Sequence, residues 1–233
     1  MNNDPRHRLI VALDVSTAAA ARKIVAAVGD SAQTYKVGMQ LYTAEGPSIV
    51  RELVGSGRRV FLDLKYHDIP NTVAAAVREA SQLGVSMLTV HASGGGKMLR
   101  AAVEAAQASQ TIPLVLAVTV LTSLDEVELG KIGLRGRVVD QVLRLTALAL
   151  SNGCQGVVAS AREAGAMREE FGNDFAIVTP GVRAAGSGPH DQVRIVTPAE
   201  AIAAGASHIV VGRPITEASD PAAEAKAILG QIA

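Results

Sequence analysis

Short runs of Val, Leu and Ile alternate with longer, Ala-rich stretches along most of the chain. The apolar runs predict strands, and apolar residues at helical spacing predict helices between them. We expect eight strands, at residues 9–13, 34–37, 60–64, 87–90, 114–118, 156–158, 175–179 and 208–211. The clearest helical patterns cover residues 17–28, 71–83, 97–107, 137–150 and 162–171. Short apolar strands that alternate with helices indicate βαβ units and a parallel sheet.

Eight such units in 233 residues favour a closed barrel. A (β/α)₈ TIM barrel typically takes about 250 residues, so we expect one α/β barrel domain over residues 1–233. An open, doubly wound sheet is the alternative architecture. The glycine fingerprint that such sheets carry after their first strand is missing, and Leu13-Asp14-Val15-Ser16-Thr17 stands in its place.

Polar residues gather where the expected strands end. In a barrel these ends share one rim, where active sites are built, so scattered residues would converge on one pocket. The residues are Asp14, Lys36, Asp63, Lys65, His91, Thr119, Thr122, Ser123, the run Thr179-Pro180-Gly181 and the run Gly212-Arg213-Pro214.

The stretch from Phe61 to Thr72 concentrates this polarity. Asp63 and Lys65 are two apart at the end of the third strand, so their side chains point to one face. Asp68 follows just beyond the strand, and we expect Asn71 and Thr72 to cap the next helix. A buried structural ion pair is the alternative reading, but such pairs contribute little to stability. Charged groups in this arrangement favour a functional site.

Two loops on the same rim suggest a site for a phosphate. Gly212 allows close backbone approach, Arg213 offers a planar fork of donors, and Pro214 suits the start of a short helix. The loop 182–193 contains Arg183 and Gln192 and is rich in glycine, which is typical of a mobile lid. A plain connection, and an Arg213 that pairs with a surface carboxylate, are the alternatives.

Composition excludes several classes of partner. The 22 basic and 22 acidic residues cancel, which gives no electrostatic case for binding nucleic acid or a membrane. The single Cys154 excludes an internal disulfide, and no His or Cys cluster at ligand spacing suggests a metal. Residues 1–8 lack the apolar run of a signal peptide, so we expect a cytoplasmic protein.

The run Asp63-x-Lys65-x-x-Asp68-Ile69-Pro70-Asn71-Thr72 resembles the signature of the bacterial orotidine 5′-phosphate decarboxylase family. The Asp-x-Lys-x-x-Asp core also occurs in related barrels that use magnesium. The following Ile69-Pro70-Asn71-Thr72 and the late run Val211 to Ile215 favour the orotidylate enzyme over those relatives. Further similar segments occur in the family's order. They are Ala12-Leu13-Asp14, Tyr35-Lys36-Val37-Gly38, Val90-His91-Ala92-Ser93-Gly94-Gly95, Val120-Leu121-Thr122-Ser123, Thr179-Pro180-Gly181-Val182-Arg183 and Val211-Gly212-Arg213-Pro214-Ile215.

The resemblance implies a homodimeric lyase of pyrimidine biosynthesis that converts orotidine 5′-monophosphate to uridine 5′-monophosphate without cofactor or metal. Lys65 would protonate C6 of the pyrimidine, beside Asp63. Lys36 would complete an alternating charged array with Asp63, Lys65 and Asp68. With Asp14, it would also hold the ribose hydroxyls. Thr122 and Ser123 would contact the pyrimidine, and Gln192, Gly212, Arg213 and Arg183 would bind the phosphate. Pro180 and Asn71 would also contact the substrate. Asp68, Ile69 and Thr72 would reach the neighbouring subunit's site.

Two other functions remain open from the residues. Lys65 could form a Schiff base in an aldolase, although that chemistry needs a neutral amine and neighbouring carboxylates favour an ammonium. A non-catalytic sugar-phosphate-binding protein would use Gln192 and Arg213, but it has no need of Asp63 and Lys65.

Overall fold

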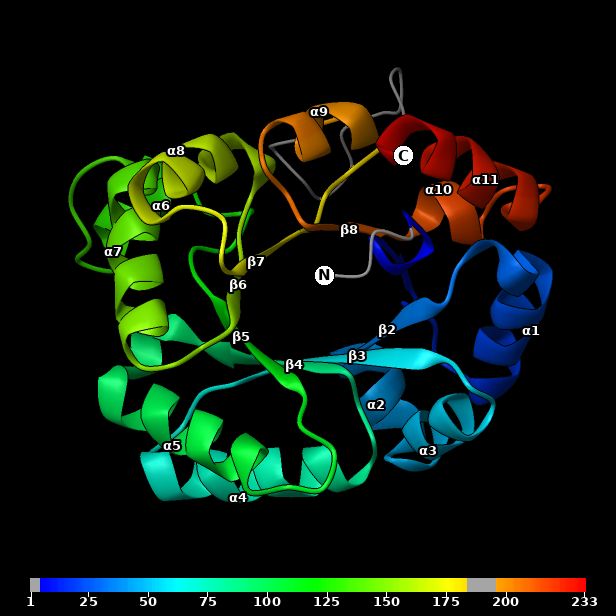
Figure 1. The fold of residues 1–233 in the computed structure, drawn as a ribbon, viewed down its shortest axis with the longest axis horizontal. Helices are drawn as coiled ribbons and strands as arrows, with labels where there is room; N and C mark the ends of the chain where they lie inside the picture. Colours follow the sequence, from blue (N-terminus) through cyan, green and yellow to red (C-terminus); the bar gives the residue numbers. More distant parts are fainter. Residues whose placement is uncertain (1–4, 184–195) are drawn as a thin grey trace.

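The strands of the protein form a closed parallel barrel in the order β1 to β8, which confirms the expected fold class and excludes the open sheet (Figure 1). The structure is a computed structural model, and it describes residues 5–183 and 196–233. The strands are β1 Leu9–Ala12, β2 Thr34–Gly38, β3 Arg59–Tyr66, β4 Met87–His91, β5 Leu114–Val118, β6 Gly156–Val158, β7 Ala176–Thr179 and β8 His208–Val211.

Helices surround the barrel and cover its outer face, as Figure 1 shows. They are α1 Ala18–Val28, α2 Met39–Glu45, α3 Ser48–Gly55, α4 Pro70–Gln82, α5 Gly96–Gln107, α6 Glu126–Lys131, α7 Val138–Ser151, α8 Ala161–Phe171, α9 Pro198–Ala203, α10 Arg213–Thr216 and α11 Pro221–Ile232. Within the described ranges, no helix combines the length and the apolar character needed to cross a bilayer.

Local chemistry explains several helix starts. The Thr17 hydroxyl accepts from the Ala20 amide at 3.2 Å, so Thr17 caps α1 and is not its first residue. Thr197 and Glu200 form a reciprocal capping box at α9, which satisfies amides that the first turn leaves unpaired.

The expected caps of α4 are wrong. The helix begins at Pro70, with Ile69 as the N-cap residue, so Asn71 and Thr72 already lie inside its first turn. Proline suits this position because its fixed φ matches the helix and it has no amide to leave unpaired. The Asp68 carboxylate instead accepts from the Ile69 amide at 2.6 Å and holds the turn before the helix.

Alternation along the strands separates two cores. Residues that point inward fill the barrel, and those that point outward pack under the helices. The inner cluster consists of Ile10, Ala12, Phe61, Met87, Leu116, Ala176, Val178 and Val210, all nearly or fully buried. This packed plug of side chains fills the interior, as is usual for barrels of eight parallel strands.

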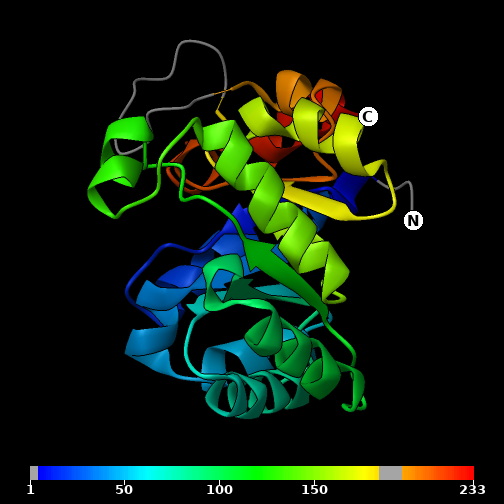
Figure 2. The ribbon, with the colours of Figure 1, turned by 90° about the vertical axis from the view of Figure 1, so that its left-hand side faces the viewer.

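The two ends of the barrel differ in role. Figure 2 shows the segment after β5, with α6, on the side opposite to the C-terminus. The C-terminal helix is fixed at the amino-terminal end of the strands, where the Arg8 guanidinium donates to the Ile232 carbonyl at 3.0 Å. Active sites of such barrels lie at the opposite end, where the strands have their carboxyl ends.

Candidate active site

A cavity of about 550 Å³ opens above the plug at the carboxyl ends of the strands. This volume lies within the usual range for a small-molecule site. Its lining includes many of the residues expected from the sequence, namely Asp14, Lys36, Asp63, Lys65, Thr122, Pro180, Arg183, Gly212 and Arg213. Residues from β1, β2, β3, β5, β7 and β8 thus meet in one place.

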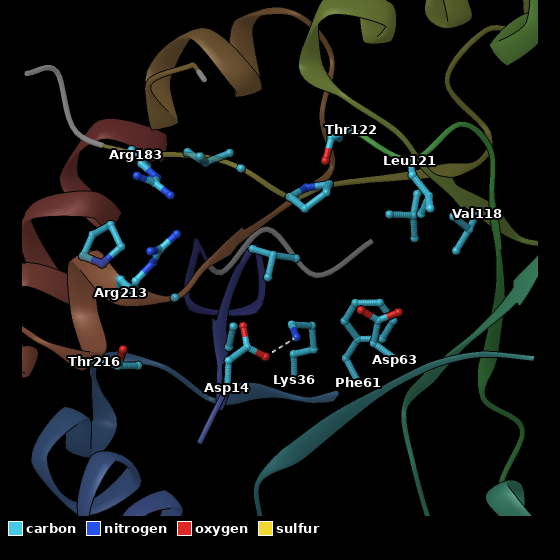
Figure 3. Close-up of a pocket in the computed structure, with 18 of the residues that line it drawn as sticks. Asp14, Lys36, Phe61, Asp63, Val118, Leu121, Thr122, Arg183, Arg213 and Thr216 are labelled. Atoms are coloured by element: carbon cyan, nitrogen blue, oxygen red, sulfur yellow. Dashed lines mark hydrogen bonds and ion pairs between the residues drawn. The ribbon is translucent and has the colours of Figure 1, made fainter. Parts of the chain in front are cut away.

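Asp14 and Lys36 form an ion pair at the floor of this cavity. Lys36 pairs in register with Ala12 of β1, and Asp14 follows two residues later on the same inward face. The Lys36 Nζ donates to the Asp14 Oδ1 at 2.7 Å, a contact drawn in Figure 3. The Asp14 side chain is 58% exposed and that of Lys36 is 12% exposed, so the carboxylate opens to the cavity while the lysine stem is packed.

Asp63 and Lys65 form a second and tighter pair. The Lys65 Nζ donates to both oxygens of the Asp63 carboxylate, at 2.9 and 2.8 Å. Both side chains are partly buried, which weakens solvent screening of their attraction. The structure thus brings these two charges together as the spacing indicated.

The third strand extends further than expected, to Tyr66. Lys65 adopts φ of 52°, and it is the only non-glycine residue with positive φ in the described part of the chain. This left-handed conformation is unfavourable for a side chain other than glycine and commonly marks a functional position.

The two ion pairs approach each other across β2 and β3. Gly38 pairs in register with Asp63, and a Cβ added at Gly38 would lie 3.0 Å from the Lys36 Nζ. The ammonium of Lys36 therefore lies over Gly38, beside the Asp14 carboxylate to which it donates. Opposite charges alternate along this side of the cavity.

Two arginines line the other end of the cavity. Figure 3 shows the guanidinium groups of Arg183 and Arg213 on one side, with Val118, Leu121 and Thr122 across from them. Arg183 is buried, with only 7% of its surface exposed, and Arg213 opens the short helix α10, as the glycine and proline around it indicated. The cavity therefore has a cationic end and a mainly apolar end.

Several expected site residues do not line the cavity of this single chain. Asp68, Ile69, Asn71, Thr72 and Ser123 are exposed and outside the lining. Gln192 and most of the expected lid lie outside the described residues. His91, at the end of β4, lies with its ring 5.3 Å from that of His67. Burial, with the nearby charges of His67 and Lys65, lowers the pKa of His91.

Sequence reasoning missed Thr89, whose hydroxyl contacts both Asp63 and the Lys65 backbone. It also missed the apolar lining residues Val118, Leu121, Val158 and Val210. Val118, Val158 and Val210 lie on strands, so their inward direction could have been read from alternation, whereas Leu121 lies in the segment after β5.

Comparison with known proteins assigns the chain to a family. Residues 7–228 match the model of the Orotidine 5′-phosphate decarboxylase / HUMPS family. The orotidine 5′-phosphate decarboxylase of Halorhodospira halophila is 54% identical over 226 residues, which cover 97% of this chain and 96% of that protein. The one from Moorella thermoacetica is 52% identical over 233 residues, with 97% and 92% covered.

A solved structure agrees with this assignment. The orotidine 5′-phosphate decarboxylase from Lactobacillus acidophilus has a TM-score of 0.87 and 39% identity, covering 97% of this chain and 99% of its own. Sequence and fold match over nearly their whole lengths. The chain therefore belongs to the orotidine 5′-phosphate decarboxylase family.

Proposed function

We propose that this member of the family converts orotidine 5′-monophosphate to uridine 5′-monophosphate and carbon dioxide in the described cavity, with Lys65 as the general acid. The observation that carries the proposal is the Lys65 ammonium, held by both carboxylate oxygens of Asp63 at the cavity wall. An ammonium fixed in this way is prepared to meet a developing negative charge without reorganising.

The chemistry requires such a group. When the bond between C6 and the carboxylate breaks, its electron pair stays on C6, where little delocalisation is available. The Lys65 ammonium stabilises this charge and then transfers its proton to C6, while its nitrogen recovers a proton from solvent. Asp63 lies beside the departing carboxylate, and it keeps the ammonium aimed along the cavity.

The layout of the cavity supports a nucleotide. Arg213, Arg183 and the backbone at Gly212 would bind the phosphate at the cationic end, together with Gln192 from the segment outside the described residues. Asp14 and Lys36, between the two ends, would hold the ribose hydroxyls. Thr122, Ser123 and Pro180 would contact the pyrimidine near the apolar end. Phosphate sites after strands seven and eight are common in this type of barrel.

We further propose a homodimer in which Asp68, Ile69 and Thr72 reach the neighbouring subunit's site. Ile69 is 67% exposed and Met39 is 55% exposed. Met39 directly follows β2, and Ile69 lies in the short turn between β3 and α4. Large apolar side chains at such positions favour burial against a partner. A two-fold arrangement would make the sharing of Asp68 reciprocal.

The test of the activity is a spectrophotometric assay on orotidine 5′-monophosphate with EDTA present. We expect turnover, whereas the magnesium-dependent chemistry of the related barrels would stop. Lys65→Ala should lower kcat by about 10²–10⁴-fold while substrate binding persists. Lys226→Ala, an exposed lysine on α11, is the matched control and should behave as the parent. A Lys65→Ala protein within about tenfold of the parent, or about 1.4 kcal/mol in barrier, contradicts the role.

Subunit mixing tests the shared site. Lys65→Ala and Asp68→Ala dimers should each be severely impaired. After the two are unfolded and refolded together, a mixed dimer has one site with both lesions and one with neither, and should recover about half the parent activity. No recovery, with mixed dimers confirmed by mass, would mean that Asp68 acts within its own subunit.

A further inference from the structure

The pairing of β3 with β4 is interrupted beside the Asp63–Lys65 pair. Leu62 pairs with Leu88, and the next pair is Tyr66 with Val90. Residues 63–65 of β3 therefore stand opposite the single residue Thr89 of β4. Bulges of this kind occur next to active sites, where they redirect a side chain.

The bulge leaves backbone groups that the regular ladder would have paired. Lys65 adopts the positive φ described above within this segment. Its amide has lost the partner that a regular neighbouring strand would provide. A buried amide without a partner is costly, so the bulge needs a group that replaces the missing acceptor.

Thr89 supplies that group with its side chain. The Thr89 Oγ1 accepts from the Lys65 amide at 2.9 Å. The same oxygen donates to the Asp63 Oδ1 at 3.0 Å. The roles of donor and acceptor are fixed, because an amide can only donate and its acceptor keeps its own proton for the carboxylate.

One hydroxyl thus ties together the backbone of Lys65 and the carboxylate that holds its ammonium. Thr89 is fully buried and is not among the residues that line the cavity. Its methyl group fixes χ1, since a β-branched side chain has few rotamers, and this aims the hydroxyl at the bulge. Thr89 can act on a ligand only through Asp63 and Lys65.

We propose that Thr89 is a positioning residue for the decarboxylation, which holds Lys65 in its left-handed conformation and sets the direction of its ammonium. This inference rests on the proposed role of Lys65. A displacement of about 1 Å at a reacting group can lower a rate by about 10²-fold, so the loss of this hydroxyl should affect the chemical step.

A buried threonine hydroxyl does not by itself make a positioning residue. Thr34 is also fully buried, at the first residue of β2, and its Oγ1 has no hydrogen-bond partner in the described part of the chain. Thr34→Val therefore removes a buried hydroxyl from β2, the strand on the other side of β3, and leaves the contacts of the bulge with Thr89 intact. It is the matched control for Thr89→Val.

The experiment compares Thr89→Val, Thr89→Ser and Thr34→Val. We expect Thr89→Val to lower kcat by about 10- to 100-fold, with KM and the Kd for uridine 5′-monophosphate within about twofold of the parent. Thr89→Ser keeps the hydroxyl and should recover kcat to within about threefold. Thr34→Val should match the parent. A general packing defect would instead lower Tm and weaken binding along with turnover, and serine would not rescue it.

Several results would overturn the proposal. They are a kcat of Thr89→Val within twofold of the parent, a serine variant as slow as valine, and an equal loss in kcat and nucleotide affinity. If Thr89→Val does not fold, Thr89→Ala replaces it, and failure of both to fold would assign Thr89 to the structure alone.

A second readout separates this inference from the proposed function. Hydrogen exchange of the Lys65 amide should be faster in Thr89→Val than in the parent, whatever reaction the protein performs. Unchanged exchange would contradict the proposal that the Thr89 hydroxyl holds the Lys65 amide. Faster exchange in a protein that does not turn over orotidine 5′-monophosphate would contradict only the proposed reaction.

Discussion

His208 should make the stability of the barrel sensitive to mild acid. This histidine opens β8 at the amino-terminal end of the barrel, and its Nδ1 is buried with no hydrogen-bond partner among the described residues. Burial, followed by the nearby charges of Arg59, Arg8 and His7, lowers the pKa of His208 from 6.5 to about 4. All the causes act in the same direction, so the folded protein holds this ring neutral.

The sign of the effect follows from proton binding. Below pH 6.5 the unfolded chain takes up a proton at His208 that the folded protein refuses until about pH 4. The stability that the folded protein gains from the neutral His208 is therefore fully present above pH 6.5. It is lost progressively as the pH falls from 6.5 toward about 4. Linkage gives a loss of about 2 kcal/mol between pH 7.5 and pH 5.

The measurement is urea unfolding of the parent and of His208→Gln at several pH values between 7.5 and 5, at one protein concentration. The absolute stability of the variant is immaterial, because groups other than His208 titrate in both proteins and cancel in the difference. The parent should lose about 2 kcal/mol more than the variant over this range. Thr34→Val, a neutral change at the same end of the barrel, should keep the parent's slope. Parallel curves for the parent and His208→Gln, within about 0.5 kcal/mol, would refute the reasoning.

Three further substitutions have distinct expected outcomes. Arg213→Ala should raise KM for orotidine 5′-monophosphate by about 10- to 100-fold, from the loss of a charge-assisted hydrogen bond, and should leave the affinity for a phosphate-free analogue unchanged. Gly38→Ala should lower kcat/KM by about tenfold with little change in Tm, because the new Cβ displaces the flexible end of Lys36. Unaltered activity would show that Lys36 moves aside freely. Arg168→Lys should destabilise the fold by about 2 kcal/mol in urea unfolding, because lysine cannot replace its fork of hydrogen bonds to the carbonyls of Gly205, Gly172 and Phe175. A normal unfolding midpoint would contradict this.

The fold could be predicted from the sequence because most of the strands are short apolar runs, which a parallel sheet buries on both faces. The runs at 114–118, 156–158 and 208–211 are strands over the expected residues. The helices α2 and α3 were not predicted, because Gly46 and Pro47 divide that segment into two short pieces with weak periodicity. α4 begins at Pro70 because the fixed φ of proline decides its start over the capping tendency of Asn71 and Thr72.

The charged members of the candidate site could also be predicted, because strand ends converge whatever the details of the barrel. Thr89 could not, since its role depends on a shift in register between β3 and β4. No local pattern around Lys65 reveals that its amide lacks a neighbour in the ladder. Such pairing is set by contacts between distant segments, which a single sequence does not display.

Closure of the barrel has a consequence for how the chain is made. Leu9 of β1 pairs with Ile209 of β8, and the Arg8 side chain donates to the carbonyls of Ser207 and Ile232. On a ribosome, β1 emerges early but one of its edges has no native neighbour until almost the whole chain has been synthesised. Any nascent chain that stops before β8 exposes open sheet edges at both β1 and β7, and each is a template for pairing with another chain. The last strand thus pairs the free edge of the first. The nascent chain therefore stays prone to aggregation through this edge until translation is nearly complete.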